Sequence, residues 1–333
     1  MSKHAPFFVI LAALLLIPLY SAASAAAEGQ EEETLNFAID GALYTAPDDE
    51  PAPFINHDRR TLVPVSFFAK AMGVSASDVH WDNETKTATI AQGERVVVMT
   101  AGQANMRVND EEIAMDTRAE VVHGRVFIPV RYIAEGLGGS IVWDASTRIV
   151  HITTAKHQRP TLTPDEARQA LGEQADAVLS ALADKDMKTL ASYVHPSKGV
   201  RFTPYTHVDM LHQVRLTPAM LEKAFDAAHN YVWGLYDGSG EPIELSFSEY
   251  YEQFIYPHNF IDNAEISYNE PLFSGNMINN AALAYPGSII VEYHIEAINP
   301  DYGGLDWQSL RLVFEQLDER WLLVGIINDQ WTI

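Results

Sequence analysis

The side chains whose types and spacing could do chemistry lie close together in the second half of the chain. A histidine beside a carboxylate can act as a general acid and base, which in an apolar cavity suits a hydrolase or an isomerase. The same side chains could instead bind a ligand without reacting with it. The candidates are His195, Arg201, Tyr205, His207 and Asp209, followed by His212.

A metal site is a third interpretation of this cluster. On a strand, His207 and Asp209 would share one face, whereas His212 would point to the other. Neither spacing is typical of a metal site, and His195 precedes Pro196 as in a capped turn. We therefore expect no metal here and assign no catalytic residue, because solvated loop residues explain the pattern most simply.

Aromatic side chains are a second candidate feature of this half of the chain. Trp307 and Trp331 belong to a set of tryptophans and tyrosines that could stack on a sugar or hold an apolar ligand. The same rings suit a core that must form without disulfides, since the chain has no cysteine. Trp307 and Trp331 are therefore candidates for ligand binding as well as for packing.

The familiar catalytic motifs are absent from the sequence. It contains no His-Glu-x-x-His, no Ser-x-x-Lys, no Gly-x-Ser-x-Gly and no phosphate-binding loop. The lack of cysteine also excludes a thiol nucleophile, an iron–sulfur cluster and a cysteine zinc site. We expect no cofactor, and the hydrolase or isomerase remains an alternative to a non-enzymatic function.

The candidates lie in a segment, residues 163–333, in which helix signals come first and strand signals come last. Thr163, Pro164 and Glu166 form a capping-box pattern at a helix start. Residues 309–328 are typical of a long antiparallel hairpin. We expect an α+β domain whose N-terminal helices pack on a curved antiparallel sheet.

This order of elements, with the run Ala-Leu-Ala-Asp-Lys-Asp-Met-Lys-Thr-Leu-Ala-Ser-Tyr-Val-His-Pro at 181–196, resembles the nuclear transport factor and ketosteroid isomerase superfamily. The ending Trp-Leu-Leu-Val-Gly-Ile-Ile-Asn-Asp-Gln-Trp-Thr-Ile is also similar to an uncharacterised domain of secreted bacterial proteins. The resemblance implies a cone-like domain. Residues 231–285 are longer and more irregular than that plan needs.

The first half of the chain contains one pattern twice, over 35–90 and 95–152. Each copy predicts a strand, a helix and two further strands. Proline begins each helix, a glycine is placed for its left-handed cap, and a Trp-Asp pair ends the next strand. These structural positions are Pro64, Gly73 and Trp81 in the first copy, and Pro129, Gly138 and Trp143 in the second.

The two tryptophans of the repeat are open to two interpretations. Trp81 and Trp143 occupy the same position in both copies, which favours a side chain that covers the apolar stripe of the helix. The alternative is that one or both stack on a sugar.

The duplicated pattern, Val/Ile-Pro-Val followed by Met/Leu-Gly and Trp-Asp, resembles the copper amine oxidase N-terminal domain, or stalk domain, over about residues 35–153. The resemblance implies an α+β module at the cell surface that binds the envelope or acts as a spacer. It does not imply oxidase activity. The copper site of that family needs a His-x-His pair, which is absent, and Asn230-Tyr231-Val232 lacks the acid of the quinone motif.

The N-terminus is typical of an exported protein. A basic start, an apolar run and small residues indicate a signal peptide at 1–27, followed by an acidic leader at 28–34. A linker is expected at 154–162, between the stalk domain at 35–153 and the domain at 163–333. We expect no stable membrane span after cleavage of the signal.

The net charge of −23 disfavours nucleic acid as a partner, since phosphates would be repelled. Together these features predict a non-enzymatic, secreted bacterial cell-envelope protein that is associated with the wall. Its stalk domain would bind the wall or act as a spacer there, and its C-terminal domain would hold a ligand or partner. The expected partners are wall glycan or peptide, or another envelope protein.

Overall fold

A computed structural model describes residues 35–45, 50–158, 162–273, 275–297 and 299–332. The predicted signal peptide, the acidic leader and residues 159–161 of the predicted linker lie outside the described residues. Among the helices of the described residues, none has the length and apolar character needed to cross a membrane. Leu35–Ile333 forms one compact unit.

The first copy of the repeat contains six strands and one α-helix. In chain order its elements are β1 (Asn36–Ile39), β2 (Ala42–Tyr44), β3 (Phe54–Ile55), β4 (Thr61–Pro64), α1 (Val65–Ala71), the 3-10 turn η1 (Ala76–Asp78), β5 (Val79–Asp82) and β6 (Thr87–Gln92).

The second copy begins with a strand that the sequence pattern did not predict, β7 (Arg95–Thr100). The others are β8 (Asn105–Val108), β9 (Glu111–Ala114), β10 (Glu120–Val122), β11 (Arg125–Pro129), α2 (Val130–Gly136), β12 (Ser140–Asp144) and β13 (Ile149–Thr153).

The predicted helix boundaries of the repeat are confirmed. Pro64 and Pro129 are the residues directly before α1 and α2, where a missing N–H leaves no bond unmade. Gly73 and Gly138 follow the helices with φ of 72° and 83°. This left-handed conformation costs an L side chain energy but costs glycine none, so glycine ends both helices.

The two copies are interwoven. The hairpin β12–β13 of the second copy extends the hairpin β1–β2 of the first, giving the sheet order β12-β13-β1-β2. The hairpin β5–β6 of the first copy joins β8–β9 of the second through β7, in the order β5-β6-β7-β8-β9. A third sheet, β10-β11-β4-β3, pairs the two central strands. Each sheet therefore needs both copies.

The described residues of the second half contain six α-helices, most of them short. They are α3 (Pro164–Ala183), α4 (Met187–Tyr193), α5 (Pro218–Leu221), α6 (Phe247–Tyr250), α7 (Phe260–Asn263) and α8 (Ala281–Ala284). The capping box at Thr163 and Glu166 is confirmed, and Asp186 caps α4. Ser246 caps α6, and a π-helical turn, η3 (Tyr251–Ile255), follows.

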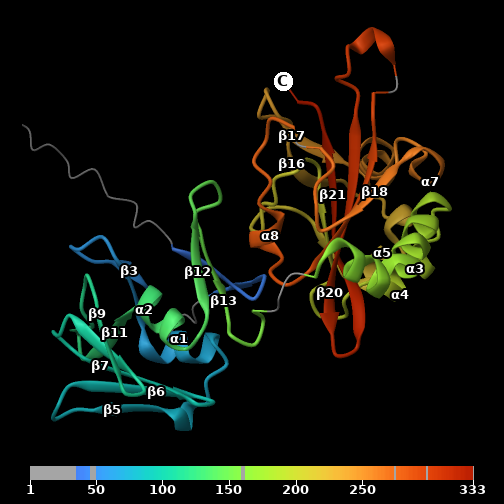
Figure 1. Ribbon diagram of the computed structural model, residues 1–333. Coiled ribbons are helices and arrows are strands. Elements are labelled where there is room, and N and C mark those ends of the chain that lie inside the picture. The colour runs from blue at the N-terminus through green and yellow to red at the C-terminus, as the bar shows by residue number, and fades with distance from the viewer. Residues whose placement is uncertain (1–34, 46–49, 159–161, 274, 298, 333) are drawn as a thin grey trace, which may run out of the picture. The chain divides into compact units, whose positions relative to one another are not determined.

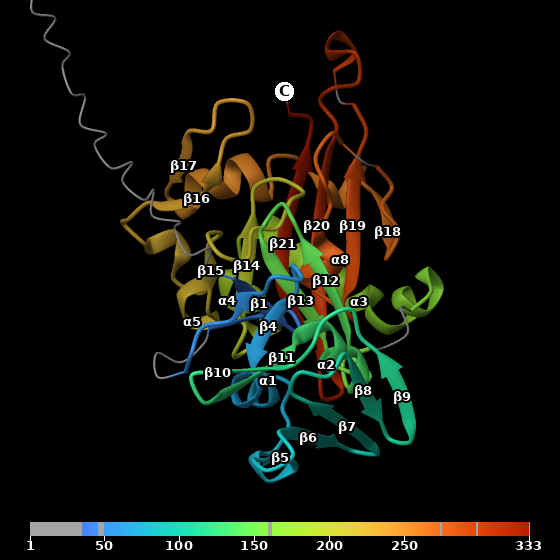
Figure 2. The same cartoon turned by 90° about the vertical axis from the view of Figure 1, so that its left-hand side faces the viewer.

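The strands of this half form a six-stranded sheet and a separate hairpin. They are β14 (Val200–Thr203), β15 (Arg215–Leu216), β16 (Tyr231–Leu235), β17 (Pro242–Leu245), β18 (Glu265–Tyr268), β19 (Ile289–Ile295), β20 (Gln308–Leu317) and β21 (Arg320–Gln330). The sheet order is β15-β14-β21-β20-β19-β18, and Figure 2 shows β21 to β18 side by side.

The expected α+β fold class is confirmed, with helices α3, α4 and α5 on one side of the sheet (Figure 1). The sheet is mixed rather than wholly antiparallel, because β14 runs parallel to β21. Residues 233–240 form the end of β16 and most of the turn that leads to β17.

Aromatic side chains fill the space between the helices and the sheet. Trp233 stacks on Tyr250 with ring centroids 4.0 Å apart, and Tyr250 stacks on Phe254 at 5.0 Å. All three are buried, and the edge of Phe202 from β14 meets the first two. The aromatic residues of this region therefore serve as core.

The opposite face of the sheet carries a buried ionic network. Arg311 pairs with Glu292 at 3.0 Å and with Asp329 at 2.9 Å, and it donates to the Thr206 hydroxyl at 2.8 Å. The three charged side chains are almost wholly inaccessible. Burial raises the pKa of Asp329 although Arg311 opposes the shift, so this network tolerates little rearrangement.

A further apolar cluster includes residues from both halves of the compact unit. Ala38 and Ile149 of the repeat pack in one cluster with Val208, Ala284 and Val313. The polar contacts at its border include those from Lys198 Nζ to the Asp40 carbonyl at 3.0 Å and from the Asn280 amide to the Asp144 carboxylate at 3.2 Å.

Candidate ligand-binding site

The predicted cluster around His195 does not converge on a common point. His195 is buried, and its Nδ1 accepts from the backbone N–H of Lys198 at 3.0 Å and of Ser197 at 3.3 Å. Burial lowers the pKa of His195, which keeps the ring neutral and able to accept these bonds. The residue therefore caps a turn, as the simplest interpretation of the sequence has it.

Arg201 and Asp209 hold the loop between β14 and β15. The Arg201 guanidinium donates to the carbonyls of Met210 at 3.0 Å and Gln213 at 3.3 Å. The Asp209 carboxylate caps the next turn and pairs with His212 at 2.7 Å. Both charged side chains therefore have their partners within this loop.

The other candidates have separate surroundings. His207 lies 3.3 Å from the Ile278 carbonyl, and Tyr205 packs against Phe254 in the core. Trp307 is buried against Phe273, whereas Trp331 is exposed. Among the described residues, no group of three or more His, Asp or Glu side chains could hold a metal ion.

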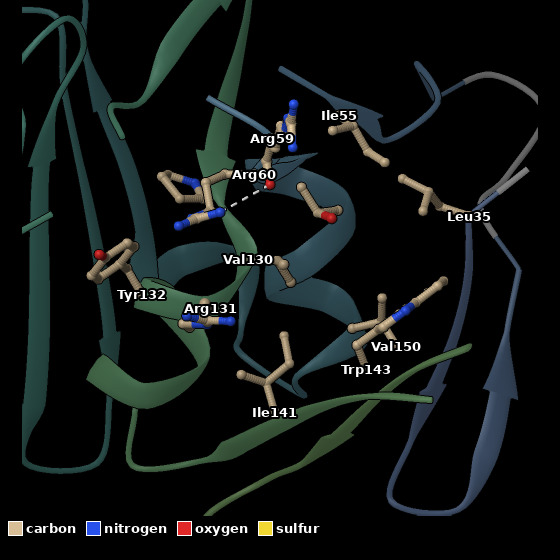
Figure 3. A pocket seen from close by; sticks show the side chains of 12 residues that line it. Leu35, Ile55, Arg59, Arg60, Val130, Arg131, Tyr132, Ile141, Trp143 and Val150 are labelled. Atoms are coloured by element: carbon tan, nitrogen blue, oxygen red, sulfur yellow. Dashed lines mark hydrogen bonds between the residues drawn. The ribbon is translucent and has the colours of Figure 1, made fainter. Parts of the chain in front are cut away.

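A different site lies in the stalk domain. It is a cavity of about 260 Å³, here called the cationic pocket (Figure 3). Four separate segments of the repeat form its walls. The lining residues are Leu35, Ile55, Arg59, Arg60, Thr61, Pro129, Val130, Arg131, Tyr132, Ile141, Trp143 and Val150.

Arg60 is fixed by neighbouring groups. Its Nε donates to Asp116 Oδ2 at 2.9 Å, and its Nη1 donates to the Arg59 carbonyl at 3.2 Å. The pairing with Arg60 lowers the pKa of Asp116, since the cation favours the carboxylate. The Tyr132 hydroxyl donates to the same carboxylate at 3.0 Å. Asp116 thereby ties the Arg59–Arg60 turn to the start of α2.

The other two guanidinium groups are more accessible, and the charge of Arg131 helps to lower the pKa of Asp116. Within the described residues, neither Arg59 nor Arg131 has a side-chain hydrogen bond or an ion pair, and both side chains are exposed. Arg59 has a φ of 58°, a left-handed conformation held by the bond from Arg60 to its carbonyl. Two unpaired cations at one cavity are unusual in a chain whose net charge is −23.

Apolar side chains form the remainder of the cationic pocket. Figure 3 shows Ile141, Trp143 and Val150 on the side away from Arg59 and Arg60, with Val130 between. Trp143 is 49% exposed. It was expected to cover the helix, but its ring stands at the mouth of a cavity because the α2 stripe is already buried in the core. Trp81, its counterpart, is partly buried against that core.

The equivalent place in the first copy lacks these cations. Ser66 stands where the second copy has Arg131, and its hydroxyl donates to Glu50 at 3.0 Å. The sequence shows this difference, but the repeat is recognised by the residues that both copies share. A search for positions where the copies differ in charge would have found Arg131.

Comparison with family models gives a match to part of the chain, within the duplicated region. Residues 39–152 match the family model described as the copper amine oxidase N-terminal domain. No curated protein matches the chain.

Two solved structures are similar to about half of the chain. Aln2 from a Streptomyces species has 8% identity and a TM-score of 0.25, covering 51% of this chain and 94% of that one. A putative calcium/calmodulin dependent protein kinase II association domain from Xanthomonas campestris has 13% identity and a TM-score of 0.22, covering 48% and 84%. Both similarities are weak.

Proposed function

We propose that this protein is a non-enzymatic, exported bacterial envelope protein whose stalk domain binds an acidic component of the cell wall through the cationic pocket. The observation that carries the proposal is the pair of unpaired guanidinium groups, Arg59 and Arg131, beside the exposed ring of Trp143. An acidic ligand would neutralise both cations and cover apolar surface at the same time.

The acidity of the chain makes this site selective. A net charge of −23 repels acidic polymers from most of the surface, so binding depends on the local cations. Asp116 already neutralises the charge of Arg60, so Arg60 would fix the position of the turn that carries Arg59 rather than attract the ligand. Arg59 and Arg131 are therefore the residues on which affinity should depend.

The alternative, a hydrolase or isomerase, would need His195, His207 and Asp209 to converge in an apolar cavity. Instead, His195 binds its own turn, and Asp209 binds the next turn and His212. Trp233, Tyr250 and neighbouring rings of this half are packed together in its core. The geometry favours binding over catalysis.

Sedimentation with cell envelopes isolated from the source organism tests the proposal. The chain should pellet with the envelopes, and Arg131→Ser should weaken this at least about ten-fold, because a charge-assisted hydrogen bond contributes about 1.5–3 kcal/mol. The variant installs the residue that the first copy has at this place, so the fold should tolerate it.

Arg107→Ser is the matched control, since Arg107 is exposed on β8, outside the cationic pocket, and the charge change is the same. It should bind as the unmodified chain does. Equal binding by Arg131→Ser and the unmodified chain, or no retention at all, would overturn the proposal.

A further inference from the structure

We infer that the occupant of the cationic pocket is an extended, acidic segment of a partner protein, which adds as a strand to the free edge of β12. This inference rests on the proposed function and names the ligand for the same site. Three features support it: the open edge of β12, the aliphatic lining of the pocket, and the two unpaired cations.

β12 is the outer strand of the sheet β12-β13-β1-β2. Its pairing with β13 is regular from Ser140 to Asp144, so alternate N–H and C=O groups of β12 face away from β13. Natural edge strands are usually protected by proline, lysine or a bulge, and β12 has none of these. Its Val142 and Trp143 are exposed. The Gln158 side-chain amide meets the Ser140 N–H at one end of this edge, and Asp144 is buried against Asn280 at the other. Residues 141–143 are therefore the part of the edge that is suited to accept another strand.

The lining of the cationic pocket distinguishes a peptide from a sugar. Five aliphatic side chains surround the cavity: Leu35, Ile55, Val130, Ile141 and Val150. Apart from the arginines, the side-chain polar groups are few, and the Tyr132 hydroxyl is already bonded to Asp116. A sugar would leave most of its hydroxyls without partners here, whereas an apolar side chain beside a carboxylate would fit.

The β12 strand and the two arginines, Arg59 and Arg131, line the same cavity. Ile141 and Trp143 point to the same face of β12, and both line the cavity. Every second side chain of an added strand would point to this face as well. An apolar side chain could then enter the cavity while a neighbouring acidic side chain pairs with Arg59 or Arg131. The partner therefore needs acidic and apolar residues mixed on one face.

Titration of the full-length chain with defined probes tests this. The first is a capped peptide, Glu-Glu-Ile-Ile-Glu-Glu, in which each face carries Glu, Ile and Glu. The second replaces every Glu by Lys, and the third is oligogalacturonate, an acidic sugar. Binding is measured together with hydrogen exchange at the backbone of β12 and of β5, the equivalent edge strand of the first copy.

The Glu peptide should bind and slow exchange in β12 but not in β5. Arg131→Ser should weaken this binding at least about ten-fold, and Arg107→Ser should leave it unchanged. The Lys peptide and oligogalacturonate should not bind. Binding of oligogalacturonate in preference to the peptide, or peptide binding without protection of β12, would overturn the inference.

The envelope experiment separates this inference from the proposed function. Protease treatment of the envelopes should abolish retention of the chain, and hydrolysis of the glycan should not. Retention that depends on Arg131 but survives protease would overturn the peptide inference and leave the proposed function standing. Absence of retention would instead contradict the proposed function.

Discussion

Val63 of the first copy lies opposite Ile128 of the second, at the centre of the antiparallel ladder between β4 and β11. The two residues occupy equivalent positions in the repeat, so the pairing is symmetric about them. Both are wholly buried. Because the outer sheets also combine strands from both copies, the repeat is a single folding unit rather than two small domains.

Neither copy should therefore fold alone. A fragment of residues 35–94 lacks β13, β11 and β7, which pair with β1, β4 and β6, and it should remain unfolded by circular dichroism. A fragment of residues 35–158 contains all of these partners and should unfold in a single transition. A folded 35–94 fragment would contradict the interwoven arrangement.

The two repeat tryptophans should differ in their effect on stability. Trp81→Ala removes a ring that packs against the core and should cost about 1–3 kcal/mol, less than the ~3–5 kcal/mol of a fully buried tryptophan. Trp143→Ala removes a half-exposed ring and should cost less than about 1 kcal/mol. Urea unfolding measures both. Equal costs would mean that Trp143 is packed as Trp81 is.

The buried ionic network should be sensitive to loss of its one cation. Arg311→Met leaves Glu292 and Asp329 buried together without a partner charge, and it should cost about 3–5 kcal/mol. Arg320→Met makes the same change at an exposed position at the start of β21 and should have an effect of less than about 0.5 kcal/mol. A small cost at Arg311 would show that water reaches the pair.

Stability should depend on pH through His294. This buried ring lies 2.8 Å from the Ser309 hydroxyl, and burial lowers its pKa although nearby carboxylates oppose the shift. The unfolded chain then binds the proton more readily, so the contribution is complete above about pH 6.5 and is lost as the pH falls through the folded pKa.

Urea midpoints at about pH 7.5 and 5.5 test this. The unmodified chain should lose more stability between the two pH values than His294→Asn, which cannot take up the proton. The other titrating groups are common to both chains and cancel. An identical loss in the two chains would contradict a lowered pKa at His294.

The features that could be predicted from the sequence are those decided by neighbouring residues. The cap at Thr163 and the left-handed Gly73 and Gly138 depend only on the few residues around them, and all three are confirmed. The parallel pairing of β1 with β13 joins residues more than a hundred positions apart. No local pattern contains that information. The strand β7 is different, because it pairs with β6, its neighbour in the sequence, and its run of valines is a local strand signal.

The predictions made from the sequence were less accurate for the functional site than for the fold. His195, His207 and Asp209 are close in sequence, but each has its own partners in the surrounding loops. The cationic pocket is built from segments that lie far apart in the sequence, including Ile55 and Trp143. It depends on a charge at Arg131 that one copy has and the other lacks, whereas the repeat pattern consists of what its copies share.

The most direct test of the cationic pocket is the fluorescence of Trp143 during titration with acidic material solubilised from the envelope. The six tryptophans of the chain contribute to the signal, so the unmodified chain is compared with Trp143→Phe and Trp81→Phe. The account predicts a saturable change that persists in Trp81→Phe and disappears in Trp143→Phe. An unchanged response in Trp143→Phe, or no response in the unmodified chain, would contradict it.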